Sequence, residues 1–131
     1  MYPSTHAAQS YRQTLVESST PVERVVLLYD AAIQWNSMAR AAIERGDISS
    51  RREAMARLLA IIDALQSSLD MTAGAGIAEN LDRLYGYITT RVTDAAFEQV
   101  VAPLDDVHTV LATLREGWTR LAADTKLVKV S

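Results

Sequence analysis

Four long segments of this chain carry apolar residues at alternating spacings of three and four positions. The clearest series runs through residues 100–124 and consists of Leu104, Val107, Leu111, Leu114, Trp118 and Leu121. Residues 21–45, 50–71 and 77–97 show similar series. This periodicity is that of a helix with one apolar face. Each apolar face has to be covered by the other helices, so the pattern favours a helical bundle.

Local signals mark the ends of the segments. Thr20, Pro21 and Glu23 have the pattern of a capping box with proline in the first turn, and Gly46 is a helix stop. Pro103 fits only a first turn, so the last regular helix should start near residue 102. The short turn at 72–76 is typical of antiparallel neighbours. We therefore expect an all-α fold: an antiparallel up-and-down four-helix bundle with a short extra N-terminal helical segment.

The domain organisation follows from the length. A chain of 131 residues can bury one core without covalent staples, and this chain contains no cysteine. We expect residues 1–131 to form a single helical-bundle domain. Within it, residues 1–20 are expected to be a mobile N-terminal segment and residues 125–131 a disordered tail.

Charge and hydropathy exclude several classes of protein. The net charge is −3, and the arginines alternate with acidic residues, so no basic stripe for nucleic acid is visible. No apolar run reaches the length of a transmembrane helix, and the N-terminus lacks the features of a signal peptide. We expect a cytosolic protein that does not insert into a membrane.

Patterns for catalysis or cofactor binding are missing. The chain has two histidines, and Asp105-x-x-His108 is a lone pair where a di-iron bundle needs two pairs and two further glutamates. Nothing around His108 supports a phosphohistidine, and the turn glycines lack the lysine of a phosphate-binding loop. Asp105 and Asp106 point about 100° apart on a helix. We expect no enzyme activity, no metal and no cofactor.

Several apolar residues lie off the main series and suggest a binding surface. Leu27 and Leu28 flank Tyr29, and Ile61 lies beside the series of its helix. A broad core face explains each of them singly. Together they favour grooves between helices in which a helix of another protein can lie.

The chain resembles the FliS family of flagellar export chaperones. The matching blocks, in chain order, are Tyr11 with Val16 to Pro21, Leu27 to Ile33, Gly46-Asp47, Ile61 to Asp70, Gly76 to Tyr87, and Arg91-Val92 with Trp118. They span about residues 11 to 120. The sequence departs from the family pattern at Ala31, where glycine is usual, at Gly86, where aspartate is usual, at Ala75-Gly76, where paired glycines are usual, and at Ala95-Ala96.

The resemblance implies a cytoplasmic chaperone that binds the disordered C-terminal segment of flagellin. Such a chaperone prevents premature polymerisation and delivers flagellin to the flagellar type III export gate. The resemblance also implies contact with the cytoplasmic domain of an export-gate protein, and some family members bind regulatory proteins of flagellar assembly. The N-terminal segment is expected to cover part of the groove when flagellin is absent. The candidate flagellin-binding residues are Tyr11, Leu28, Ile33, Ile61, Leu65, Leu81, Tyr85 and Tyr87.

One alternative stays open at this point. A structural helical bundle that self-associates through its apolar seams, without a flagellin client, would have the same periodicity. The apolar residues off the main series distinguish the two hypotheses, because a plain bundle does not need them. The periodicity is also compatible with a homodimer.

Overall fold

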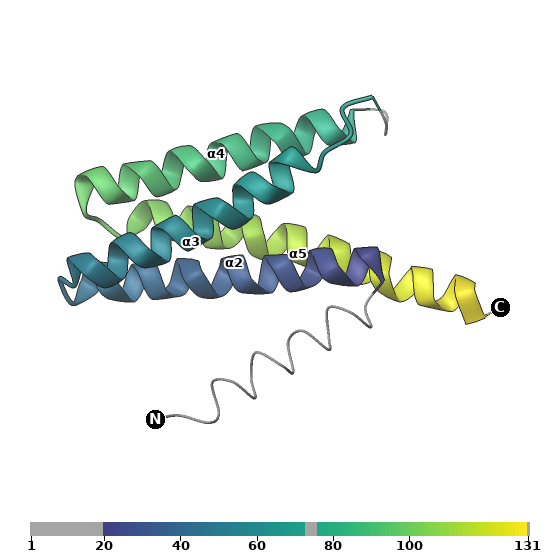
Figure 1. The fold of residues 1–131 in the computed structure, drawn as a ribbon, viewed down its shortest axis with the longest axis horizontal. Coiled ribbons are helices and arrows are strands. Elements are labelled where there is room, and N and C mark those ends of the chain that lie inside the picture. Colours follow the sequence, from purple (N-terminus) through teal and green to yellow (C-terminus); the bar gives the residue numbers. More distant parts are fainter. Residues whose placement is uncertain (1–19, 73–75, 131) are drawn as a thin grey trace, which may run out of the picture.

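The chain folds into four α-helices in a computed structural model that describes residues 20–72 and 76–130. The helices are α2 (Pro21–Glu44), α3 (Ile48–Ser67), α4 (Ile77–Glu98) and α5 (Ala102–Val130), and consecutive helices run antiparallel (Figure 1). The predicted all-α up-and-down bundle is confirmed. The expected N-terminal helical segment lies in residues 1–19, outside the described residues. Within the described ranges, no helix has the length and hydropathy of a membrane span.

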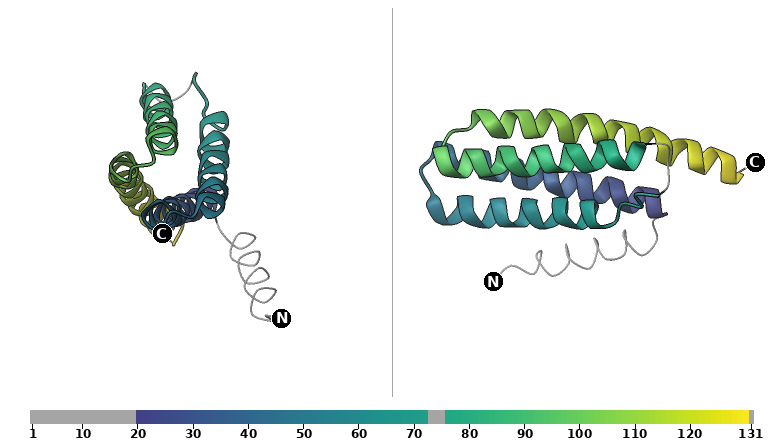
Figure 2. Two further views of the ribbon diagram at one scale, coloured as in Figure 1. Left: turned by 90° about the vertical axis from the view of Figure 1, so that its left-hand side faces the viewer. Right: turned by 90° about the horizontal axis from the view of Figure 1, so that it is seen from above.

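The helices lie at the corners of a square when the bundle is seen end-on (Figure 2). α2 packs against α3 and α5, and α4 packs against the same two helices from the other side. α2 and α4 are therefore diagonal neighbours, as are α3 and α5. The centre is filled by Tyr29, Ala32, Ala39, Ala54, Met55, Leu58, Ile62, Leu65, Tyr85, Ile88, Val92, Ala95, Leu104, Val107 and Leu111.

The start of α2 and the turn into α3 have the hydrogen bonds that the sequence predicts. The Glu23 N–H donates to Thr20 Oγ1 at 3.1 Å, and the Thr20 N–H donates to the Glu23 carboxylate at 3.4 Å. Gly46 has φ +70°. Its N–H donates to the Ile43 carbonyl and the Asp47 N–H to the Ala42 carbonyl, which is the Schellman pattern. Asp47 then caps α3 by accepting from the Ser50 N–H at 3.0 Å.

Two helices differ from their predicted ranges by more than one residue. α3 was expected over 50–71 and occupies Ile48–Ser67, because Asp47 itself is the N-cap and the Ser68 hydroxyl donates to the Leu65 carbonyl at the other end. α5 starts at Ala102, as Pro103 requires, but it continues to Val130. The segment expected to be a disordered tail is helical as far as residue 130. Neither glycine nor proline follows Gly117, so nothing in the sequence stops the helix there.

Two polar contacts lie inside the core. The hydroxyls of Tyr29 on α2 and Tyr85 on α4 are 2.6 Å apart, so this contact crosses the diagonal of the bundle. Asn36 is buried in α2 and donates from Nδ2 to the Leu104 carbonyl of α5 at 2.9 Å. These contacts link α2 to α4 and to α5 within the apolar interior.

The first turn of α5 is tied to two different helices. Asp105 accepts from Arg40 of α2 at 2.7 Å, and Asp106 accepts from Arg91 of α4 at 2.9 Å. Further along the bundle, Arg115 of α5 pairs with Asp30 of α2. The two adjacent aspartates therefore diverge, as predicted. They act as separate links between helices.

Candidate partner-binding surface

The structure separates the eight residues proposed from the sequence into three groups. Leu65 and Tyr85 are buried in the core. Ile33, Ile61 and Leu81 are half-buried at the edges of that core. Leu28 and Tyr87 are exposed, with 37% and 43% of their surface accessible. Tyr11 lies outside the described residues.

Leu65 and Tyr85 cannot contact a partner on the surface of this conformation, because their side chains are covered by other helices. Tyr85 is 1% exposed and its hydroxyl is bonded to Tyr29. Burial raises the pKa of both tyrosines above the usual value, although the hydrogen bond to Tyr85 partly counteracts this at Tyr29. Both hydroxyls therefore stay protonated at neutral pH. In this structure Leu65 and Tyr85 support the helices that carry the surface residues.

One apolar strip follows the outer edge between α2 and α3. Leu28, Ala31, Trp35 and Met38 recur at spacings of three and four along α2, so they share one side of the helix. The guanidinium of Arg57 from α3 lies over the Trp35 ring, 5.8 Å from its centroid. Ile61 follows one turn later. We call these six residues the α2–α3 seam.

The α2–α3 seam differs from the edge between α2 and α5. Two ion pairs bridge that second edge, Arg40 with Asp105 and Asp30 with Arg115. Ile33 lies between them, so that this candidate sits beside charged links. The α2–α3 seam is instead bridged by the contact of Arg57 with Trp35. It offers apolar surface over several turns.

A second apolar strip follows the edge between α4 and α5. Tyr87 lies one turn before Arg91, which reaches α5 through Asp106. From that pair the antiparallel register brings Ile77 of α4, which is 62% exposed, to the level of Leu121 of α5. We call the following residues the α4–α5 seam: Ile77, Leu84, Tyr87, Leu114, Gly117 and Leu121.

Gly117 lies in the interior of α5 without a local reason for a glycine. Its φ is not positive, and a Cβ added there would find no atom within 4 Å. Glycine inside a helix costs roughly 1 kcal/mol relative to alanine. The monomer therefore gains nothing visible from this residue, although a helix from another molecule could approach α5 closely there.

Sequence reasoning missed several exposed apolar residues. Ile77 and Leu121 were assigned to the core series of their helices, but both are exposed, at 62% and 46%, and Ile77 is the first residue of α4. Met38 and Trp35 escaped because only residues beside the strongest series were considered. The spacing of Leu28, Trp35 and Met38 was the available signal. Phe97, which is 89% exposed near the end of α4, follows no such series.

The same surface lacks the geometry of a metal site. Among the described residues, no group of three histidine or carboxylate side chains gathers closely enough to hold an ion. The ion pair with Arg40 holds the pKa of Asp105 below its usual value, so this carboxylate stays charged in its structural pair.

Known proteins resemble this chain over most of its length. The family model described as "Flagellar protein FliS" matches residues 4–125. The flagellar secretion chaperone FliS of Vibrio cholerae is 31% identical over 117 residues, covering 86% of each chain. That of Salmonella typhimurium is 30% identical over 116 residues, covering 88% of this chain and 86% of the relative. A crystal structure titled as a bacterial flagellar chaperone superposes with a TM-score of 0.75 at 20% identity, covering 93% of this chain and 99% of the other.

Proposed function

Since the chain belongs to the FliS family of flagellar secretion chaperones, we propose that it binds the disordered C-terminal segment of flagellin in the cytoplasm. In this proposal the bound segment cannot polymerise prematurely, and the complex delivers flagellin to the type III export gate. The relatives are described as secretion chaperones. Binding to flagellin, delivery to the export gate and the cytoplasmic location are what we propose for this chain.

The observation that carries the proposal is the partly exposed apolar strip on a bundle whose core is already filled. Leu28 and Met38 are exposed and Trp35 is half-buried on one outer side of α2, although the inner side of that helix is covered by α3 and α5. An apolar strip of this kind is a binding site for an amphipathic helix. The self-associating alternative uses the same strip, so that binding to flagellin has to be measured directly.

A disordered client can fold on this surface. Apolar residues of the client would leave water on contact with the α2–α3 and α4–α5 seams. Coupled folding of this kind typically buries on the order of 1,000–3,000 Å² and loses roughly 2–5 kcal/mol to ordering. A client whose apolar side is covered in this way has no free surface for the contacts of a filament. No nucleotide or metal takes part in the proposed binding.

Tyr87 is the proposed contact for which the sequence and the structure agree best. Its ring is 43% exposed on the α4–α5 seam, and tyrosine combines a large apolar surface with a polar end. Tyr85, two residues earlier, points about 200° away around the helix into the core. Only one tyrosine of this pair is therefore placed to meet a client.

Calorimetric titration of the full chain with the last few dozen residues of flagellin from the same genome tests the proposal. We expect binding near one to one, with a negative heat-capacity change. Tyr87→Ala should weaken binding by roughly fivefold or more, as expected for a contact worth over 1 kcal/mol, and should leave the melting temperature nearly unchanged.

Phe97→Ala is the matched control, since it also removes an exposed aromatic ring, but at the end of the bundle. It should leave the affinity unchanged. No binding by the unaltered protein would contradict the proposed function. Light scattering that showed an oligomer indifferent to the peptide would support the self-associating bundle instead.

A further inference from the structure

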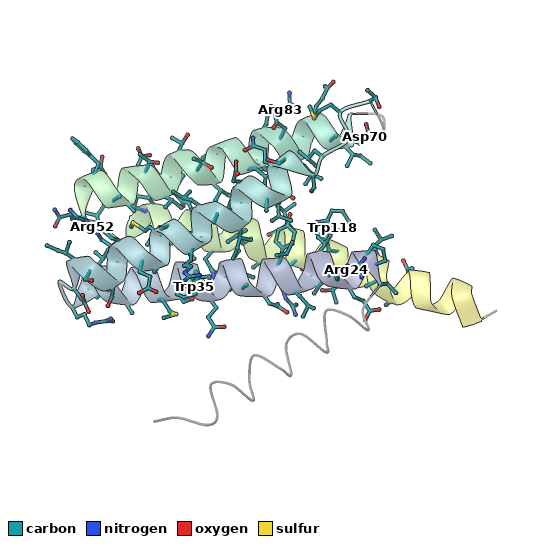
Figure 3. The ribbon with its side chains drawn as sticks, viewed as in Figure 1. Arg24, Trp35, Arg52, Asp70, Arg83 and Trp118 are labelled. Atoms are coloured by element: carbon teal, nitrogen blue, oxygen red, sulfur yellow. The ribbon has the colours of Figure 1, made fainter. Side chains whose placement is uncertain are left out.

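Arg57 is the charged residue at the centre of the α2–α3 seam. Its guanidinium lies over the Trp35 ring at 5.8 Å from the centroid. Such a contact holds the cation by its attraction to the ring and by the apolar contact of the arginine stem. Trp35 belongs to α2 and is labelled beside that helix in Figure 3. The contact therefore fixes a positive charge in an otherwise apolar strip.

The hydrogen-bond donors of Arg57 are left available. Its ion pair with Glu53 is 4.0 Å long, which is beyond a hydrogen bond. Within the part of the chain that the structure describes, Arg57 donates no hydrogen bond. A guanidinium carries five N–H donors in a planar fork that matches a carboxylate. A preset fork of this kind loses less conformational entropy on binding than a free arginine does.

The residues around Arg57 point to the chemistry of a partner. On the outer side of α3 its neighbours are the small, exposed residues Ala56, Ala60 and Ala64. On α2, Ala31 and Met38 lie one turn before and one turn after Trp35. A helix lying here would bury apolar side chains on both sides of one cation. Its own polar complement at that point would be a carboxylate.

We infer that Arg57 binds a carboxylate of the client: a client helix in the α2–α3 seam places one Asp or Glu against the Arg57 guanidinium. This inference rests on the proposed function and adds a requirement to it. The client helix needs heptad-spaced apolar residues together with one acidic residue at the level of Trp35. A helix with a basic residue there is disfavoured by like-charge repulsion.

The experiment uses the full chain and a peptide of the last few dozen flagellin residues, titrated at low and high salt. Arg57→Ala should weaken binding about tenfold, which corresponds to about 1.4 kcal/mol. Arg57→Lys should recover part of the loss, because it keeps the charge and lacks the planar fork. Added salt should weaken the unaltered protein more than the Arg57→Ala variant.

Arg52→Ala is the matched control. Arg52 is exposed on the same helix, but it lies five residues before Arg57 and hence about 140° around the helix, toward the α4 side (Figure 3). This variant should bind like the unaltered protein. Each Asp and Glu of the peptide is then replaced in turn by its amide. One of these peptide replacements should weaken binding to the unaltered protein as much as Arg57→Ala does. The same replacement should not weaken binding to the Arg57→Ala variant any further.

The outcomes separate the inference from the proposed function. Unaltered binding by Arg57→Ala, or a loss that couples to no carboxylate of the peptide, would overturn the anchor and leave flagellin binding intact. If the unaltered protein did not bind the peptide, the proposed function would fail, and the anchor with it.

Discussion

Replacing Tyr29 or Tyr85 with phenylalanine should destabilise the protein by similar amounts, and the two losses should not add. The two hydroxyls are 2.6 Å apart and both side chains are buried. Each change therefore leaves the remaining hydroxyl buried without this partner.

The magnitudes follow from the number of partners that each change removes. A buried polar group left unpaired costs about 1–3 kcal/mol. We expect about 1–3 kcal/mol for each single change, because each removes one partner. In the double variant neither hydroxyl is present, so that its loss should fall short of the sum by about 1 kcal/mol.

Urea unfolding followed by circular dichroism measures these values, since a small single domain is expected to unfold in one transition. For a chain of this size each kcal/mol corresponds to a shift of roughly 3–6 °C in melting temperature. A single variant without loss, or strictly additive losses in the double variant, would refute the reasoning. Flagellin binding by Tyr85→Phe should be kept, because the hydroxyl supports the helix from inside.

Two other predictions concern stability. Gly117→Ala should raise the free energy of unfolding by about 0.5–1 kcal/mol, because the added Cβ meets open space and the backbone is helical. Gly46→Ala should lower the free energy of unfolding, because alanine is strained at φ +70°. Thermal unfolding of the two variants measures both changes. The Ser50 backbone N–H holds the pKa of Asp47 below its usual value. The stability that the charged Asp47 carboxylate provides is complete above about pH 4 and is lost as the pH falls further. The urea midpoint of Asp47→Asn should therefore fall less on acidification than that of the unaltered protein. The same dependence of the midpoint on pH in both proteins would contradict this prediction.

The bundle could be predicted from the sequence because its signals are local. The apolar spacing identified four helices, and Thr20, Gly46 and Pro103 identified their ends. The end of α5 could not be predicted in the same way. The last helix was expected to end near Asp124 and residues 125–131 to be a disordered tail, but a helix can continue beyond its packed part where no residue breaks it.

The binding surface could be predicted only in part. Tyr85 and Tyr87 are two positions apart and equally apolar, and only packing against Tyr29 decides which one is buried. The predicted core series of α4 ran through Leu84, whereas the structure buries Tyr85 and leaves Leu84 half-exposed. The contact of Arg57 with Trp35 joins residues on two helices. No spacing within one helix indicates such a contact.

The bond from Asn36 to the Leu104 carbonyl has a consequence for the choice among alternative bundles. Four similar apolar stripes can pack nearly as well if one helix slides by a turn, about 5.4 Å, or if the bundle forms with the opposite hand. Each of those arrangements would move the Asn36 amide away from its acceptor and leave it buried without a partner. A single polar group in the interior thus penalises the competing folds more than it stabilises the correct one.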